Sequence, residues 1–541
     1  MRNPKPIPRL LSTLKTRIAA GVLALALIGS MAPPVAALAD AQDSDKQRPR
    51  GNTYIDQYMK ANWDGELARG IPYPSRTKPA VLYGSWFDMG RQYGKAFGKY
   101  VRIVYDANYG LFLNSQLPPE KLGPVLDKYM DETGKLSPEM VEFVKGIGTG
   151  AAPELNGADH AAALTNTQKV MLVNCLFEVV IPPAWSHVAQ MMNEPVPAAA
   201  QSKAQADFEP FASHAWATWG NMTRGHTGIM GGTRDQPWMP TLYNVSYVAV
   251  PSDRKAGITW GNAIAGHVAS SSQVNEYGVG LGNTIVSHKT QYFGVPALLT
   301  TAYISFFAHS ARQATDMLTV GTPEYRQKTG RKTLAYTVGF FQVFADTKEA
   351  FTVERTGRHY AVRTAGTQGE RGDYTVLANH AVAANSYDEF AKPTDQPMEN
   401  WTIAPEPDSS SLSRYWALFY EFRKNKGRVD QAFGQDRIAT MKHTYTADGK
   451  LVTTKDGLPV WRLGLTPERW LIPNPADPDS FPTGGNNMYF VADLKKRDIS
   501  WVQGIPSHWS GKWEQISLKD GKLQCLRWHH NKQQCGIRDE L

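Results

Sequence analysis

The chain contains little cysteine, and no cysteine lies at a spacing from histidine that would hold zinc. Only 3 cysteines occur in 541 residues. Cys175 lies in an apolar run, so we expect it to be buried as a small hydrophobe. Cys525 and Cys535 are close enough to close a small loop in an oxidising compartment, and the sequence leaves that disulfide open. We predict no metal site and no cofactor.

The chain also lacks a strong charge imbalance once its leader is set aside. The formal net charge is +8. Arg2, Lys5, Arg9, Lys15 and Arg17 supply five of these charges, which leaves 8 − 5 = +3 for the rest of the chain. A protein that binds nucleic acid carries a basic patch or stripe. We therefore expect no nucleic-acid partner.

Residues 1–39 have the pattern of a secretory signal peptide. A basic start is followed by an apolar core at 18–31 and a small-residue cleavage site at 37–39. The apolar core is shorter than the ~20 residues that a membrane-spanning helix needs, so we expect no integral membrane span. No cysteine follows the cleavage point, and the leader has no twin-arginine pair. These features predict a periplasmic or secreted bacterial protein.

The chain lacks the Gly-x-Ser-x-Gly elbow of α/β-hydrolases, but one predicted β-hairpin offers a different nucleophile. Its first arm spans residues 213–220, and its return arm spans about 229–236. If the turn centres near Arg224, Ser213 lies opposite Asp235. Cross-strand neighbours have Cβ atoms roughly 4.5–5.5 Å apart. The hairpin therefore predicts a hydroxyl and a carboxylate side by side.

Cleavage before Ser213 would make its hydroxyl a better nucleophile. A small-residue linker, 192–212, directly precedes it and has the composition of an exposed spacer. A cut between Ala212 and Ser213 would create an α-amine with a usual pKa of about 7.7–8.0. That amine could take the hydroxyl proton directly or through one water. No separate histidine and aspartate are then required.

The hairpin resembles the one that opens the catalytic domain of N-terminal-nucleophile (Ntn) amidases. It is most similar to the penicillin acyltransferase-like group, with choloylglycine hydrolases, penicillin V acylases and phospholipase B-like proteins as more distant relatives. Trp219-Gly220 and the run Gly231-Gly232-Thr233-Arg234-Asp235 carry the resemblance. Two residues depart from the family pattern. Ser213 stands in place of the usual Cys, and Thr233 stands in place of the usual Asn. The second departure leaves the exact register of Asp235 open by one residue.

The resemblance also implies roles for residues outside the first arm. Asp235 would orient the α-amine of Ser213. Asn379 matches an Asn whose side-chain amide donates to the oxyanion of the tetrahedral intermediate. Arg414 matches an Arg that begins a late helix and pairs with the Asp. From the residues alone, these three could instead be a turn cap, a strand cap and a solvated side chain, and His380 is expected to support packing.

The segment from about Asn52 to about Val188 is mainly helical in pattern. Its clearest helix is Tyr83–Leu113, with Asp88 as a plausible N-cap. Glycine costs about 1 kcal/mol against alanine inside a helix, so a repeated glycine needs a compensating contact. Three glycines spaced by four residues predict a close crossing with another helix or a sheet: Gly90, Gly94 and Gly98.

The pattern becomes strand-rich after Ser213, which predicts an α+β fold. The resemblance extends this to the four-layer αββα sandwich of Ntn hydrolases. Four parts of the chain are expected: a signal peptide at 1–39, a helical N-terminal segment at 40–191, a linker at 192–212 and a catalytic region at 213–541.

We therefore expect an exported, self-processing amide hydrolase or acyltransferase that forms an acyl-serine on Ser213. Two chains of one processed precursor would stay together. The 15 tryptophans and 23 tyrosines are consistent with an aromatic-lined pocket for a small-molecule amide with an apolar or aromatic acyl group, although an aromatic core would give the same composition. Two alternatives stay open: a phospholipase B-like esterase that uses the same hairpin, and an uncleaved, non-enzymatic binding protein of the same fold.

Overall fold

A computed structural model describes the chain from Pro79 onward, with gaps. The described residues are 79–113, 119–159, 163–180, 212–237, 243–269, 272–286, 292–357, 359–365, 372–383, 410–439, 471–472, 484–503 and 513–537. They all belong to one unit of the chain, Pro72–Leu541. The predicted leader and the predicted linker up to residue 211 lie outside them, so both stay predictions.

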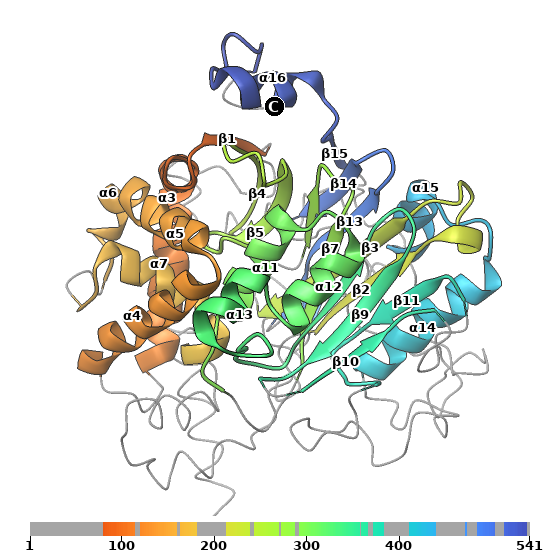
Figure 1. Cartoon of the computed structure of the whole chain (residues 1–541), viewed down its shortest axis with the longest axis horizontal. Coiled ribbons are helices and arrows are strands. Elements are labelled where there is room, and N and C mark those ends of the chain that lie inside the picture. The colour runs from red at the N-terminus through yellow and green to blue at the C-terminus, as the bar shows by residue number, and fades with distance from the viewer. Residues whose placement is uncertain are drawn as a thin grey trace, which may run out of the picture. The chain divides into compact units, whose positions relative to one another are not determined.

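Two β-sheets lie at the centre of the structure (Figure 1). The first has eight strands in the order β1-β4-β5-β6-β7-β8-β9-β10. All neighbours in it are antiparallel except β1, which pairs in parallel with β4. Its strands are β1 (Ala80–Gly84), β4 (Asn244–Pro251), β5 (Thr259–Ile264), β6 (Ser272–Asn275), β7 (Gly280–Ile285), β8 (Phe340–Ala345), β9 (Ala350–Arg355) and β10 (Tyr360–Arg363).

The second sheet has seven strands and contains the predicted hairpin. Its order is β11-β2-β3-β13-β14-β15, and β12 also pairs with β13. The hairpin arms are β2 and β3, joined through a short 3₁₀ turn at Gly220–Met222. The strands are β2 (Ala212–Thr218), β3 (Ile229–Pro237), β11 (Tyr374–Leu377), β12 (Leu471–Ile472), β13 (Gly484–Asp493), β14 (Asp498–Gln503) and β15 (Glu514–Ser517).

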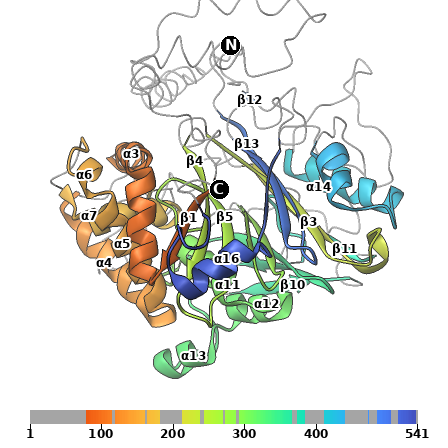
Figure 2. The same cartoon turned by 90° about the horizontal axis from the view of Figure 1, so that it is seen from above.

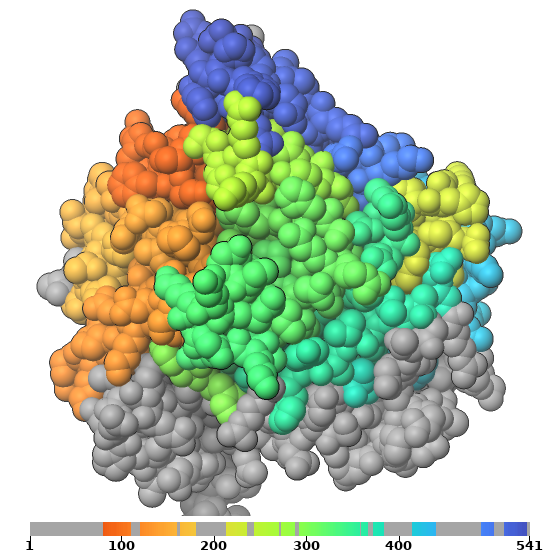
Figure 3. Space-filling model, in the orientation of Figure 1, coloured from red at the N-terminus to blue at the C-terminus, as the bar shows by residue number. Residues whose placement is uncertain are grey.

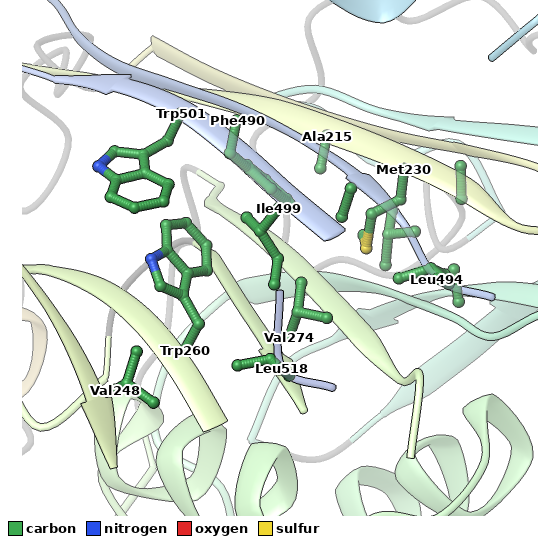
Figure 4. Close-up of a cluster of buried hydrophobic side chains, with 14 of the residues drawn as sticks. Ala215, Met230, Val248, Trp260, Val274, Phe490, Leu494, Ile499, Trp501 and Leu518 are labelled. Carbon is green, nitrogen blue, oxygen red and sulfur yellow. The ribbon is translucent and has the colours of Figure 1, made fainter. Parts of the chain in front are cut away.

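An apolar core fills most of the space between the two sheets (Figure 4). Strand residues alternate between the two faces of a sheet, so every second residue of β2 points into this core. Ala215 and Ala217 do so, and Trp216 between them packs on the other face. Across the gap, the rings of Trp260 on β5 and Trp501 on β14 lie with their centroids 5.2 Å apart. These contacts hold the two sheets face to face.

Helices cover the outer faces of both sheets, which completes the four layers. The helix α14 (Ser410–Lys424) covers the seven-stranded sheet through a second apolar cluster that includes Trp216, Tyr415 and Phe422. The helices α11 (Ala297–Phe307) and α12 (Ala311–Thr319) contact strands β6, β8 and β9 of the other sheet. The predicted α+β sandwich with the order αββα is thereby confirmed.

The N-terminal part contributes a group of helices beside this sandwich, on the side away from α14 (Figure 2). In the space-filling view these helices, in orange, abut the green helices α11 and α13 (Pro323–Thr329) (Figure 3). They are α3 (Trp86–Leu113), α4 (Pro119–Leu136), α5 (Pro138–Gly150), α6 (Ala152–Leu155), α7 (Asn166–Asn174) and a π-helical turn at Leu176–Val180. We call residues 79–180 the helical segment.

The glycines of α3 mark a close helix crossing, as predicted. A Cβ atom at Gly90 would lie 2.1 Å from Phe143 O, and one at Gly94 would lie 2.3 Å from Ile147 O, both on α5. The partner helix has glycines of its own at the crossing, because a Cβ at Gly150 would lie 2.1 Å from a carbonyl of α3. Any side chain at these positions would push the two helices apart.

Two details of the helical segment correct the sequence prediction. The helix begins at Trp86 and not at Tyr83, because Ala80–Gly84 forms β1 instead. The residue that caps it is Ser85: the backbone N of Asp88 donates to Ser85 Oγ at 3.1 Å, and the hydroxyl donates back to Asp88 Oδ2 at 2.6 Å. The sequence did not reveal β1, because a five-residue strand that pairs only with a distant strand leaves little local pattern.

The C-terminal part contains the disulfide that the sequence left open. Cys525 and Cys535 are bonded, with 5.6 Å between their Cα atoms. Cys525 lies in α16 (Gly521–His529), which contacts β1 and β4. Cys175, by contrast, is a free and fully buried thiol, as predicted.

Candidate active site

The hairpin register differs by one residue from the prediction. Ser213 pairs with Arg234, and Asp235 pairs with Ala212. The connection between the last paired residues runs from Trp219 to Gly228, so its centre falls between residues 223 and 224 and not on Arg224. Ser213 therefore does not lie directly opposite Asp235, and the offset is the one residue that the departure at Thr233 left open. The carboxylate of Asp235 lies outside the described part of the chain, so its role stays a prediction.

Ser213 is held at both of its backbone polar groups by the residues predicted to work with it. Its amide N donates to Asn379 Oδ1 at 2.8 Å. Its carbonyl oxygen accepts a hydrogen bond from Nη1 of Arg414. Arg414 Nη2 also donates to Asn379 Oδ1, at 2.7 Å. Strand β2, the segment after β11 and the start of α14 thus place three predicted residues in one part-buried network.

The amide group of Asn379 is oriented by bonds on both of its sides. Its oxygen accepts from Ser213 and Arg414, and its Nδ2 donates to Ile285 O at 2.8 Å and to Thr284 Oγ1. The oxygen therefore faces the backbone nitrogen that cleavage would turn into an α-amine. The predicted use of Nδ2 as an oxyanion donor stays a prediction, because in this structure the end of β7 receives those hydrogen bonds.

Arg414 is buried close to His380, and both its positive charge and the burial of the histidine affect the charge state of that histidine. The arginine side chain is 1% exposed, at the start of a helix that neighbouring aromatic residues hold against the sheet. Burial, together with the cations Arg363 and Arg414, lowers the pKa of His380 to about 3. The imidazole is therefore neutral at neutral pH, and it packs edge-on against Tyr415 with 5.4 Å between ring centroids. This contact agrees with a packing role for His380.

Arg234, the cross-strand partner of Ser213, reaches across the gap to the facing sheet. Its Nη2 donates to Asn262 Oδ1 at 3.1 Å and to Asn244 Oδ1. Asn262 Nδ2 in turn donates to Ser246 Oγ at 2.8 Å. A directly paired residue projects from the same face of the sheet as its partner. Arg234 and Ser213 therefore face the same space between the sheets, at the polar end of it.

Sequence reasoning missed the polar residues of the facing sheet. Asn244, Ser246, Asn262 and Thr284 are all buried, and each lies in a strand that is otherwise mainly apolar. That pattern was the available signal, because a buried amide or hydroxyl requires a hydrogen-bond partner. The partners themselves come from another sheet, so the sequence alone could not identify them.

The described residues contain neither a metal-ligand cluster nor a membrane-spanning helix. Among them no group of three or more His, Cys, Asp or Glu side chains could hold a metal ion. Within the same residues, no helix is long and apolar enough to cross a membrane.

Comparison with known proteins returned matches among solved structures only. No protein-family model and no curated protein matches the chain. It is similar to a variant of conjugated bile acid hydrolase from Clostridium perfringens, with 10% identity over 56% of this chain and 92% of that one and a TM-score of 0.31. It is also similar to penicillin V acylase from Agrobacterium tumefaciens, with 12% identity over 57% and 86% and a TM-score of 0.32. At such identities and TM-scores, the functional argument depends on the site itself.

Proposed function

We propose that the chain is an amide hydrolase of the Ntn type, which cuts itself before Ser213 and then uses Ser213 as the nucleophile. The observation that carries this proposal is the pair of hydrogen bonds that the backbone of Ser213 makes with the side chains of Asn379 and Arg414. Any buried backbone amide needs a hydrogen-bond partner. Here the partners of Ser213 are side chains of the two residues that were predicted to work with it, and one of them accepts from the nitrogen that would become the catalytic base.

Self-cleavage follows from the chemistry of the Ala212–Ser213 bond. The Ser213 hydroxyl attacks the carbonyl carbon of Ala212, and the C–N bond breaks as the hydroxyl proton passes to the departing nitrogen. This step leaves the α-amine of Ser213 free, and water then hydrolyses the ester, which releases the carboxylate of Ala212 and restores the Ser213 hydroxyl. Asn379 Oδ1 already accepts the N–H of that nitrogen, so the new amine starts in a fixed position.

Turnover of a substrate uses the same groups. The α-amine takes the Ser213 hydroxyl proton as the oxygen attacks the substrate carbonyl, and later gives that proton to the leaving amine. Water then hydrolyses the acyl-serine. Asn379 and Arg414 hold the amine and the Ser213 carbonyl during both steps, and Asp235 would orient the amine from β3. The substrate class that we propose is a small-molecule amide with an apolar or aromatic acyl group.

The fold supports lasting association of the two chains after the cut. Strand β1 comes from the helical segment and pairs with β4 of the catalytic region. Release of the helical segment would expose the edge of β4 and a large apolar surface. Export to the periplasm or medium belongs to the same proposal, and its support is the pattern of residues 1–39.

Ser213→Ala tests the proposal directly. We expect an uncut, folded and inactive precursor, whereas the parent should give two fragments, the larger of which begins Ser-His-Ala-Trp on N-terminal sequencing. Ser500→Ala is the matched control, because Ser500 is also fully buried in a strand and accepts one hydrogen bond, from Gln431 at 3.0 Å. Normal amide hydrolysis by Ser213→Ala would contradict the proposal. A parent that stays intact and inactive would favour the binding protein.

A further inference from the structure

One loop of the catalytic region is held by a side chain from the helical segment. We call residues 265–269, which follow β5, the clamped loop. Asn174, the last residue of α7, donates from Nδ2 to Gly266 O at 2.8 Å and accepts from Val268 N at 2.9 Å. Both bonds are buried. A single side chain thus satisfies a donor and an acceptor of the loop backbone, as a neighbouring strand would do.

A second side chain of the helical segment holds the same loop. The hydroxyl of Tyr93, on α3, accepts from Gly266 N at 3.2 Å and donates to His267 O at 3.3 Å. Burial raises the pKa of Tyr93, so the hydroxyl keeps its proton and can make both bonds. The clamped loop is also pressed against these helices. Gly266 has φ +94°, and a Cβ there would lie 3.0 Å from Val173 Cγ1.

The clamped loop also follows directly from a strand end that Arg234 contacts. Asn244, which accepts a hydrogen bond from Arg234 Nη2, pairs with Ile264, the residue before the loop. His267 is fully buried, and its pKa is lowered to about 3, mainly by burial and further by the nearby cation Arg234. Arg234 is the cross-strand partner of Ser213. The loop therefore lies between the two helices that hold it and the arginine opposite the nucleophile.

We propose that Asn174 and Tyr93 are positioning residues of the active site, which act through the clamped loop on the Arg234 side of it. The helical segment is then a working part of the processed enzyme and not only a remnant of the precursor. This inference rests on the proposed function, because it needs a site at Ser213 to position.

Asn174→Leu in the full, processed enzyme is the primary test. The leucine fills nearly the same volume but makes none of the loop bonds. We expect hydrogen exchange of peptide 265–269 to accelerate, and kcat to fall by on the order of tenfold or more, since small misplacements of reacting groups are costly. Asn108→Leu is the matched control. Asn108 is buried to the same degree in α3, and among the described residues it has no hydrogen bond to the clamped loop.

A double-mutant cycle separates positioning from a general loss of stability. If Asn174 acts on the site through Arg234, then Asn174→Leu should lower kcat/KM much less in an Arg234→Met background than in the parent. Additive effects on kcat/KM, or an Asn174→Leu enzyme as active as Asn108→Leu, would overturn the inference. Both results differ from failure of the proposed function, which Ser213→Ala alone reports.

Tyr93→Phe keeps the test open if Asn174→Leu does not accumulate. This change removes only the hydroxyl and its two bonds to the clamped loop. We expect the same faster exchange at 265–269 and a smaller fall in kcat, by several-fold. An unchanged kcat together with faster exchange would show that the clamped loop does not act on the site.

Discussion

The space between the two sheets has a polar end and an apolar end, and the same strands form both. On β2, the inward positions are Ser213 at one end and Ala215 and Ala217 further along. On β3, the partner of Ser213 is Arg234 and the partner of Ala217 is Met230. One strand pair therefore changes from a polar site to an apolar core within two inward positions.

The difference between the two ends shows how the fold can accommodate a site that lowers its stability. Buried polar groups destabilise a protein unless each is hydrogen-bonded, and the polar end answers this with bonds between strands and helices, such as those of Arg234 and Arg414. The apolar end contributes the stability. It also fixes the strand register, and a slip of one residue would turn every side chain of β2 to the other face. Packing at one end thus places the reacting groups at the other.

Trp260→Ala should have the largest effect on stability, because it removes a buried ring from the apolar end. Trp260 packs against Trp501 with 5.2 Å between centroids. We expect the free energy of unfolding to fall by about 3–5 kcal/mol, the usual range for such a truncation. The turnover of each folded molecule should remain near that of the parent, because the polar end keeps its bonds.

Denaturant titration and active-site counting on the same sample check this prediction. Trp528→Ala is the control, because Trp528 is 60% exposed and its loss should change stability little. A large loss of turnover per folded Trp260→Ala molecule would contradict the separation of the two ends.

The convergence of Ser213, Asn379 and Arg414 could be predicted, because short motifs identified each of them. Their geometry could not. The register of the hairpin depends on how residues 219–228 turn. The centre of that turn lies half a position before Arg224, which pairs Asp235 with Ala212 in place of Ser213. Similarly, the sequence favoured a helix over 83–113 but gave no sign of the strand before it, whose partner lies far along the chain.

Asn174 and Tyr93 show the same limit more sharply. Both are common residues in helical patterns, and nothing near them in sequence marks them as unusual. Their partners in the clamped loop lie 92 and 173 residues away. Such contacts follow from the packing of α3 and α7 on the sandwich. Sequence patterns identify the apolar face of each helix, but they do not identify the residues against which that face packs.

Substitution of Asn379 should have an intermediate effect, which will be seen in activity. Its variants distinguish between two roles at the polar end: holding the α-amine and donating to the oxyanion. Asn379→Ala loses both the acceptor for the Ser213 nitrogen and the amide donor, so we expect kcat to fall by about a hundredfold, as for loss of an oxyanion donor or a charge-assisted bond. Asn379→Asp keeps an acceptor facing Ser213 and Arg414. If holding the amine is the main role, the Asp variant should be clearly more active than the Ala variant.

Steady-state kinetics on already processed enzyme decides between these roles. Equal losses of kcat in the two variants would instead point to the oxyanion role of Nδ2. A raised KM with unchanged kcat would show that Asn379 binds substrate and does neither.

His380→Phe should have the smallest effect at pH 7. It distinguishes the polar end from the apolar end by the pH dependence of stability. The folded pKa of His380 is about 3, lowered by burial and by Arg363 and Arg414, whereas an unfolded histidine has a pKa of about 6.5. Below about pH 6.5 the imidazole of His380 binds a proton in the unfolded chain but stays neutral in the folded chain. Stability that is fully present above pH 6.5 is therefore lost progressively as the pH falls towards 3, by up to about 1.4 kcal/mol per pH unit for each such histidine.

Replacement by phenylalanine keeps the edge-on contact with Tyr415 and removes the titrating group. The free energy of unfolding of His380→Phe, measured by denaturant titration from pH 7 to pH 5, should therefore fall less steeply than that of the parent, by about 1 kcal/mol per pH unit at the acid end. Trp260→Phe, at the apolar end, should shift stability equally at every pH and keep the slope of the parent. If His380→Phe keeps that slope as well, His380 is not held neutral at the polar end, and the acid sensitivity arises elsewhere in the fold.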